Sequence, residues 1–452
     1  MVAERLGRFP DFIFLYKNLL KPYIKKALKN FLWLIFDKLV LIFVSLLVLV
    51  EVANHFGPSE YGLYQYALSL NLIFGVVTLF VDGKVVKKLF SKESEFNVLF
   101  NTVIARLALS LLSLIIGMVL LVLMDESQKF NLIYLLLLAN NIVINLVFGI
   151  ECYFDFHLKS KNIVIASNIA NTISAVLQIA AISLNLSIVV IACVVIFSSL
   201  IKALIIFYQF NKYYNKPITL KTDKILIFSI IKESAPLAIA AAAAMIYART
   251  DIIMIGAMLN LDEVGIYSIS VQMMSAVIMA IVPIQISIYP KMLEWYKESL
   301  DIYYKKYQAI SLLITWLFII GATVATFVAP FLFDLLFSNE YSKSADIFII
   351  HLIGALFIYN AVLRSSHFTI TGYTKVLMIS QIIAVFMNII LNYTLIPKIG
   401  ITGAAVATVI TQFYSLFLCN LFYKKSKNIF FIQLKSLNLF NFFKKGYLKE
   451  TF

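Results

Sequence analysis

The sequence predicts an all-α polytopic membrane protein with about twelve transmembrane helices, arranged as two pseudo-symmetric six-helix bundles. Three observations support this fold class. Of the 452 residues, 62% are hydrophobic and only 14% are charged, whereas roughly a quarter of the residues in a soluble domain are charged. Apolar stretches of about 20 residues, enough to span a bilayer, recur from residue 39 to residue 424. A short motif near residue 60 also returns near residue 263.

The apolar stretches define the predicted spans in order. They fall at 31–54, 63–81, 98–124, 132–150, 163–184, 187–210, 226–258, 265–289, 308–337, 347–371, 376–396 and 401–423. The predicted domain organisation is an interfacial N-terminal segment at 1–30, an N-lobe at 31–210, a cytoplasmic linker at 211–225, a C-lobe at 226–423 and a basic cytoplasmic tail at 424–452.

The distribution of basic residues supports this order of spans. Cytoplasmic loops of membrane proteins are enriched in Lys and Arg. Of the 38 basic residues, 29 lie in the segments predicted to be cytoplasmic, and only Lys129, Lys343 and Lys398 lie in the predicted outer loops. We therefore expect a multi-pass protein of the inner membrane with both termini in the cytoplasm. The net charge of +14 reflects this topology, and we expect no nucleic-acid partner.

An internal repeat explains the two bundles. The chain reads EYGLYQYALS from Glu60 and EVGIYSISVQ from Glu263, so Glu, Gly, an aliphatic residue and Tyr recur 203 residues apart. The first copy follows span 1 and the second follows span 7. Because six spans separate the copies, the two halves enter the membrane from the same side, which predicts a parallel repeat about an axis along the membrane normal.

Three segments of the chain are distinctive. They are FGPSEYGLYQYA at 56–67, APLAIAAAAAMIYARTDIIMIGAMLNLDEVGIYSIS at 235–270 and IPKIGITGAAVATVITQ at 396–412. In order and spacing they resemble the polysaccharide (O-antigen or repeat-unit) flippases of the multidrug/oligosaccharidyl-lipid/polysaccharide exporter superfamily. The middle segment is the most specific, because Pro236, the Arg249-x-Asp251 unit, Gly265 and Tyr267 follow the family's order. The resemblance covers nearly the whole chain.

The resemblance implies a function. It implies alternating access by two six-helix lobes around a central cavity, which moves an undecaprenyl-diphosphate-linked oligosaccharide to the outer leaflet for O-antigen or other surface polysaccharide, including lipopolysaccharide. Membrane lipid, a polysaccharide polymerase and a chain-length regulator are the further partners that it implies. A multidrug or cation antiporter and a peptidoglycan lipid-precursor flippase of the same superfamily remain alternatives, since a fold does not determine a substrate.

Charged residues inside predicted spans are the candidate functional groups, because one charge at the bilayer centre costs about 2.5–3.5 kcal/mol on insertion scales. Arg249 and Asp251 lie in span 7 and point about 200° apart on a helix, so each needs its own partner. Arg249 is a candidate for binding a diphosphate or an acidic sugar, and Asp251 is a second cavity candidate. The alternative is an interhelical salt bridge.

Further basic side chains are weaker cavity candidates. Arg364 and His367 lie three residues apart in span 10 and could form a cationic patch near lipid headgroups. Lys202 in span 6 is also a cavity candidate. For Arg364 and Lys202, the alternative is that the long side chain extends to the membrane interface. We interpret Arg106 in span 3 in the same way.

Ion coupling would require an acidic residue whose occupancy changes during transport, and Asp37, Glu51 and Asp251 are the candidates for coupling to H⁺ or Na⁺. Span amides, among them Gln272, Asn388 and Asn392, suit sugar hydroxyls, although interhelical hydrogen bonding is the favoured interpretation. No nucleotide-binding, hydrolase or metal motif occurs in the sequence. We therefore expect no catalytic residue, metal or other cofactor, and a protein that is not an enzyme.

An integral-membrane enzyme such as a polymerase, ligase or glycosyltransferase is disfavoured because such enzymes typically need a sizeable external loop. The longest predicted outer connection, near 338–346, is only about ten residues long.

Overall fold

The computed structural model describes the backbone of residues 21–124, 127–214 and 221–438, and the side chains of these ranges from Val44 onward. The predicted segments 1–30, 211–225 and 424–452 lie partly outside the described residues. The chain divides into two compact units, Met1–Val48 and Leu49–Phe452. The packing below is that within the second unit.

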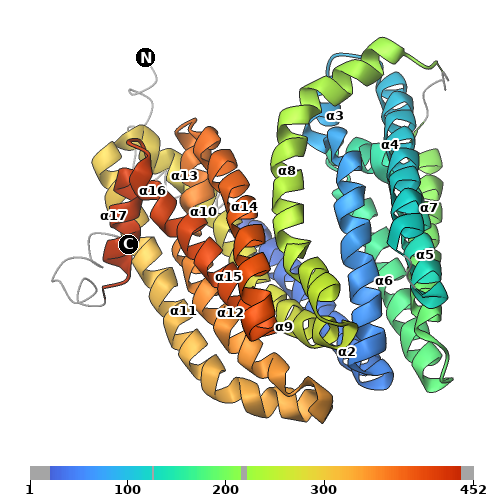
Figure 1. Cartoon of the computed structure of the whole chain (residues 1–452). Helices are drawn as coiled ribbons and strands as arrows, with labels where there is room; N and C mark the ends of the chain where they lie inside the picture. The colour runs from blue at the N-terminus through green and yellow to red at the C-terminus, as the bar shows by residue number, and fades with distance from the viewer. Residues whose placement is uncertain (1–20, 125–126, 215–220, 439–452) are drawn as a thin grey trace. The chain divides into compact units, whose positions relative to one another are not determined.

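The described part of the chain consists of helices joined by short connections (Figure 1). The first half contains α2 (Lys21–Gly75), η3 (Val76–Phe80), α3 (Gly83–Phe90), α4 (Glu95–Met124), α5 (Gln128–Phe156), α6 (Ser160–Ser183) and α7 (Ile188–Tyr213). The second half contains α8 (Lys224–Met258), α9 (Leu261–Met279), α10 (Ile281–Glu298), α11 (Leu300–Leu336), η4 (Asn339–Tyr341), α12 (Lys343–Asn360), α13 (Arg364–Ile370), α14 (Thr374–Ile399), α15 (Ile401–Gln412), the π-helical η5 (Phe413–Leu418), α16 (Cys419–Phe422) and α17 (Lys427–Ser436).

The predicted spans are confirmed. Eleven helical segments of the described residues are long and apolar enough to cross a membrane. The two first predicted spans share α2, which bends at Gly57 (φ 70°, ψ 172°) directly before Pro58. Glycine adopts this positive φ at little cost, so one helical stretch ends at this kink and the next begins directly after it. Each of the other ten predicted spans falls on its own membrane-length segment.

Polar residues in the connections determine where several helices begin. The Ser127 hydroxyl accepts a hydrogen bond from the Phe130 amide at the start of α5. Asp223 accepts from the Ile225 and Leu226 amides at the start of α8, and Asn260 accepts from the Glu263 amide at the start of α9. These side chains satisfy amides that the first helical turn leaves without a partner.

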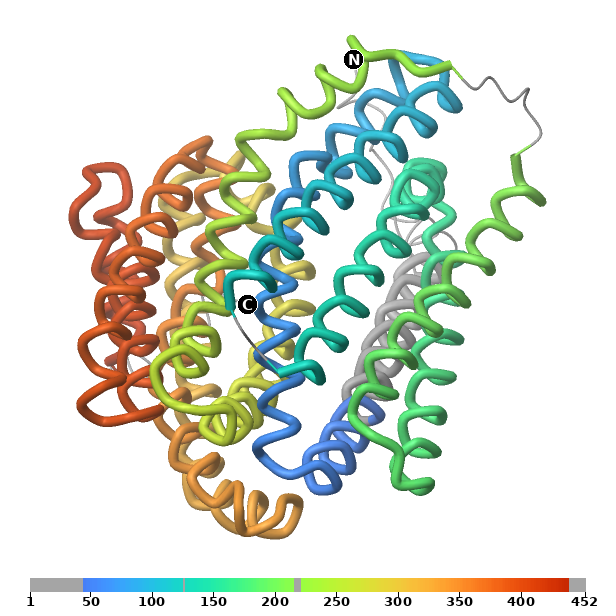
Figure 2. The backbone as a smooth tube through the Cα atoms, turned by 45° about the vertical axis from the view of Figure 1, so that its right-hand side comes forward, coloured from blue at the N-terminus to red at the C-terminus, as the bar shows by residue number. Residues whose placement is uncertain are grey.

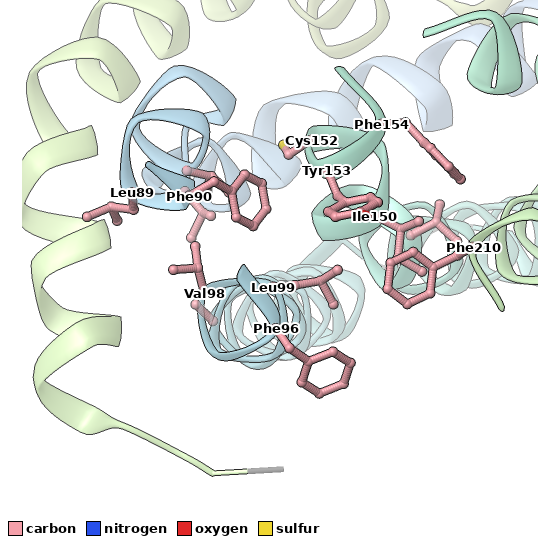
Figure 3. Packing of buried hydrophobic residues seen from close by; sticks show 14 of the residues in the cluster. Leu89, Phe90, Phe96, Val98, Leu99, Ile150, Cys152, Tyr153, Phe154 and Phe210 are labelled. Carbon is pink, nitrogen blue, oxygen red and sulfur yellow. The ribbon is translucent and has the colours of Figure 1, made fainter. Parts of the chain in front are cut away.

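A hydrophobic core holds the first half together (Figure 3). Its members come from α3 to α7, from Val81 before α3, and from the beginning of α8, which adds Leu226 and Ile230. The side chains labelled in the figure include Leu89, Phe96, Tyr153 and Phe210. The short helix α3 contributes Leu89 and Phe90 as two of its four buried residues. α3 is therefore packed into the first half although it is too short to span a membrane.

Helix α8 packs against elements of both halves of the chain. It contacts α9, α14 and α15 of the second half, and also η3, α3 and α4 of the first half. Figures 1 and 2 show α8 running from beside α3 to beside α9. The same helix carries Arg249 and Asp251.

Candidate functional site

Asp251 lies in a buried polar cluster of the second half. Its side chain accepts three hydrogen bonds from three other helices. The Tyr267 hydroxyl of α9 donates to Oδ2 at 2.7 Å, the Thr408 hydroxyl of α15 donates to Oδ2 at 2.5 Å, and the Asn392 amide of α14 donates to Oδ1 at 2.6 Å. An ionised carboxylate only accepts hydrogen bonds, so three donors match its charged form.

Further polar groups surround these three donors. Asn392 Nδ2 also donates to Asn388 Oδ1 at 3.1 Å, and the Tyr267 hydroxyl lies 3.3 Å from His351 Nε2. Asn388 and Asn392 are fully buried, one helical turn apart on α14. The carbonyl oxygen Asn392 Oδ1 is buried without a hydrogen-bond partner among the described residues. An unpaired buried acceptor is uncommon and leaves one oxygen available to a further ligand.

The cluster lacks a balancing positive charge. No Lys, Arg or His lies within ion-pair distance of Asp251 in the described ranges. An uncompensated carboxylate inside a membrane protein is costly. The Asp251 carboxylate, the two hydroxyls and the amide oxygens of Asn388 and Asn392 form an all-oxygen donor set, which suits a hard cation and equally a proton on the carboxylate.

Arg249 differs from Asp251 in its surroundings, as the predicted angle between them requires. Its side chain is half-buried, makes no hydrogen bond or ion pair with another described residue, and lies near Tyr61 of α2. The Tyr61 hydroxyl accepts hydrogen bonds from Gln65 and from Gln272 of α9. Arg249 therefore has free donors near a group of neutral polar side chains from both halves. Its role as an anion-binding residue stays a prediction.

Arg364 and His367 are both buried and have separate partners. Arg364 donates from Nε to Asn420 Oδ1 at 2.9 Å and from Nη2 to Ser380 Oγ at 3.2 Å, and it lies over the Phe368 ring. His367 Nδ1 lies 2.8 Å from the Tyr303 hydroxyl. The structure places neither of them with Arg249 or Asp251, and their predicted role in substrate binding stays untested.

The remaining predicted residues lie elsewhere. Lys202 of α7 forms an ion pair with Glu151 of α5 at 2.7 Å, so its charge is balanced within the first half. Glu51 is exposed on α2. The Asp37 side chain lies outside the described residues. Of the three acidic candidates for ion coupling, only Asp251 has a described polar cluster around it.

The sequence predicts the Asp251 cluster only in part. Asn388 and Asn392 make the predicted interhelical hydrogen bonds, to Thr408 of α15 and Asp251 of α8. Tyr267 is predicted only as a family motif residue, and Thr408 and His351 belong to no predicted site. The spacing of Asn388 and Asn392, four residues apart in one span, places two amides on the same helical face and could have indicated a site. Arg106, interpreted as reaching the membrane interface, is instead buried at 7% exposure.

Comparison with known proteins supports the predicted family. Residues 27–295 match the family described as polysaccharide biosynthesis protein. The chain is 25% identical over 409 residues to the capsular polysaccharide biosynthesis protein CapF of Staphylococcus aureus, which covers 88% of this chain and 99% of that protein.

Solved structures share the fold. The lipid II flippase MurJ in an inward closed conformation matches with a TM-score of 0.69 and 17% identity, over 89% of this chain and 90% of that one. An inward-facing multidrug resistance MATE transporter of the MOP superfamily matches with a TM-score of 0.64 and 14% identity, over 87% and 95% of the two chains. These likenesses confirm the predicted fold class of two six-helix halves.

Proposed function

Because the chain belongs to the polysaccharide biosynthesis protein family, we propose that it is a flippase that carries undecaprenyl-diphosphate-linked oligosaccharide repeat units across the cytoplasmic membrane. Its fold is that of membrane flippases and transporters. We place both termini in the cytoplasm, on the distribution of Lys and Arg. The protein supplies a path by alternating access and is not an enzyme.

The observation that carries the proposal is the pair of unlike sites on α8. Among the described residues, Arg249 is half-buried with free donors, whereas Asp251, two residues away, is buried among hydrogen-bond donors and has no ion-pair partner. A guanidinium with free donors can bind the diphosphate of a lipid-linked saccharide through paired hydrogen bonds. The nearby Gln272 and Tyr61 offer donors and acceptors for sugar hydroxyls.

Asp251 is the proposed coupling residue. A proton or a sodium ion that binds the cluster removes the uncompensated charge and adds a ligand for the free oxygen of Asn392. Because the ligands come from α8, α9, α14 and α15, occupancy would favour the arrangement of these helices in which the cluster is closed. Because Arg249 lies on the same helix, its position would then change when a cation binds at Asp251 or leaves it. This would couple cation binding to substrate binding.

Complementation tests this function. The gene is deleted, and surface glycan and intracellular lipid-linked repeat units are measured with wild-type, Arg249→Ala and Asp251→Asn copies expressed at matched levels. Lys398→Ala, an exposed basic residue, is the matched control. We expect repeat units to accumulate without the gene, and wild type and the control alone to restore surface glycan. Unchanged glycan with reduced drug tolerance would instead favour an antiporter, and accumulated peptidoglycan precursor would favour the lipid-precursor flippase.

A further inference from the structure

Arg106 is a buried arginine of the first half that the proposed function does not use. It lies on α4 and is 7% exposed. Its partners are neutral: Nη1 donates to Asn145 Oδ1 at 2.9 Å, Nη2 donates to the Val81 carbonyl at 2.6 Å, and the guanidinium lies 3.5 Å from the centre of the Phe148 ring. No ion pair of Arg106 occurs in the described part of the chain. Burying a charged arginine without an ion pair inside a membrane protein is energetically unfavourable, so we expect Arg106 to have a role beyond membrane topology.

The partner Val81 belongs to a corner between η3 and α3, formed by Val81 and Asp82. Both residues are extended, with φ −120° and ψ 95° at Val81 and φ −89° and ψ 135° at Asp82. The Val81 carbonyl therefore has no acceptor role within a helix, and the Asp82 amide has no donor role within one. Buried backbone groups need partners, and here each finds a side chain from a different helix.

The two backbone groups of the corner connect two parts of the molecule. The Val81 carbonyl accepts from Arg106 of the first-half core, whereas the Asp82 amide donates to Ser234 Oγ of α8 at 3.0 Å. Ser234 is fully buried. Gly83 fits the corner against α5, because a Cβ there would lie 3.3 Å from Cys152 Sγ. The corner is thus held on one side by Arg106 and bonded to α8 on the other.

Neighbouring contacts attach the beginning of α8 to the same half. Glu233 pairs with Lys88 of α3 at 2.7 Å. Asn101 of α4 accepts from the Asp223 amide at 2.7 Å and donates to the Lys221 carbonyl at 3.0 Å. The end of α8 around Asp251 is instead bonded to α9, α14 and α15.

The middle of α8 has few buried residues. Between Ser234 and Thr250, only Ala238 is buried, and this stretch contains Pro236 and five consecutive alanines from Ala240 to Ala244. Proline removes a backbone hydrogen bond and is a common site of helix kinks, so a change of angle between the two ends of α8 would cost least there.

We propose that Arg106 is a positioning residue, which holds the Val81–Asp82 corner so that Ser234 and the first third of α8 stay attached to the first half. Through this attachment, Arg106 determines the position of the first third of the helix that carries Arg249 and Asp251. The consequence for transport rests on the proposed function, whereas the positioning of α8 does not. Arg106 itself touches neither Arg249 nor Asp251 in any recorded contact.

Hydrogen–deuterium exchange of the full chain in lipid nanodiscs tests the positioning directly. The variants are Arg106→Lys, which retains the charge but loses the planar fork of donors, and Ser234→Ala, which removes the partner of the Asp82 amide from the α8 side. The matched control is Arg364→Lys, a buried arginine bonded within the second half. We expect both test variants to speed exchange in peptides covering 224–236 by about fivefold, as the loss of one hydrogen bond allows.

The segments in which exchange becomes faster decide between a positioning role and a local packing role for Arg106. Faster exchange at 224–236 with unchanged exchange in α4 and α5, and an unaffected 224–236 segment in the Arg364→Lys control, supports the positioning role. Unchanged exchange at 224–236 in both test variants would overturn it, as would faster exchange confined to α4 and α5, which indicates a purely local packing role. Should Arg106→Lys fail to fold, Asn145→Ala, which removes the acceptor of Arg106 Nη1 and keeps the arginine, takes its place with the same expected result. Because no substrate is present, failure of the proposed function would not alter these results.

Discussion

Gly62 and Gly265 occupy equivalent positions of the internal repeat, and they face each other's helix at one crossing of α2 and α9. A Cβ added at Gly62 would overlap the Leu261 carbonyl, and a Cβ added at Gly265 would overlap the Pro58 carbonyl. Pro58 and Leu261 are themselves 203 residues apart, like the two glycines. The two copies of the motif therefore meet in a pseudo-symmetric contact between backbones, which only glycine permits.

The repeat extends to the ion pairs beside this crossing. Glu60 pairs with Lys129 at the start of α5, and Glu263 pairs with Lys343 at the start of α12. The two glutamates are equivalent in the repeat, and their partners begin corresponding spans of the two halves. The crossing joins the halves at the bend of α2 and the beginning of α9, on the predicted outer side. In the proposed transport cycle, this contact would have to separate when the path opens outward.

The first prediction concerns the glycine crossing. Gly62→Ala and Gly265→Ala should each destabilise the purified protein by about 1–3 kcal/mol, because the added methyl group overlaps a backbone carbonyl. Gly321→Ala is the matched control, since a Cβ at this helical glycine meets nothing within 4 Å. The control should be neutral or stabilising by up to about 1 kcal/mol, from helix propensity alone. Thermal unfolding in detergent measures the difference; equal effects at all three sites would contradict the close approach.

The second prediction concerns cation binding at Asp251. Sodium that binds the folded state should raise Tm in NaCl relative to choline chloride at equal ionic strength, with stabilisation of about 2.7 kcal/mol at one hundred times Kd. Asp251→Asn keeps the size of the side chain but removes its charge, so it should abolish the shift. Asp301→Asn, at an exposed carboxylate paired with Lys305, should retain it.

Two outcomes of this experiment distinguish coupling to sodium from coupling to protons. A sodium shift that persists in Asp251→Asn would place the sodium site elsewhere. If wild type shows no sodium shift while Asp251→Asn still loses transport, the coupling ion is the proton.

The third prediction separates the two arginines of the second half. Arg249→Ala should leave the free energy of unfolding within about 0.5 kcal/mol of wild type, because its side chain has no hydrogen bond to another described residue, yet surface glycan should fall. Arg364→Ala should lower stability by about 1–3 kcal/mol, since it leaves the buried Asn420 carbonyl oxygen without its donor. Expression level, Tm and glycan are measured for both variants. A stable Arg364→Ala protein with lost transport would instead support the predicted substrate-binding role of Arg364.

The fold class and the spans could be predicted from the sequence because hydropathy is a local signal. Hydropathy placed the predicted spans on eleven membrane-length segments, the first of which holds two of them, and the repeat placed Gly62 and Gly265 in equivalent positions. It could not show that these glycines meet, because contacts between helices depend on tertiary packing. For the same reason, Asp251 was identified as costly, but its ligand Thr408, 157 residues away, was not. The partner of Arg106 could not be predicted either, because Arg106 bonds to the backbone carbonyl of Val81 and the apolar Val81 side chain gives no indication of this bond.

The central claim is that lipid-linked saccharide crosses the membrane through this protein, and leaflet accessibility measures this most directly. Spheroplasts with labelled lipid-linked repeat units are treated with an impermeant glycan-oxidising reagent, and the fraction modified is compared between the deletion strain and strains expressing wild type or Asp251→Asn. We predict modification with wild type, and protection in the deletion and Asp251→Asn strains at equal repeat-unit content. Equal modification with and without the gene would contradict the flippase function.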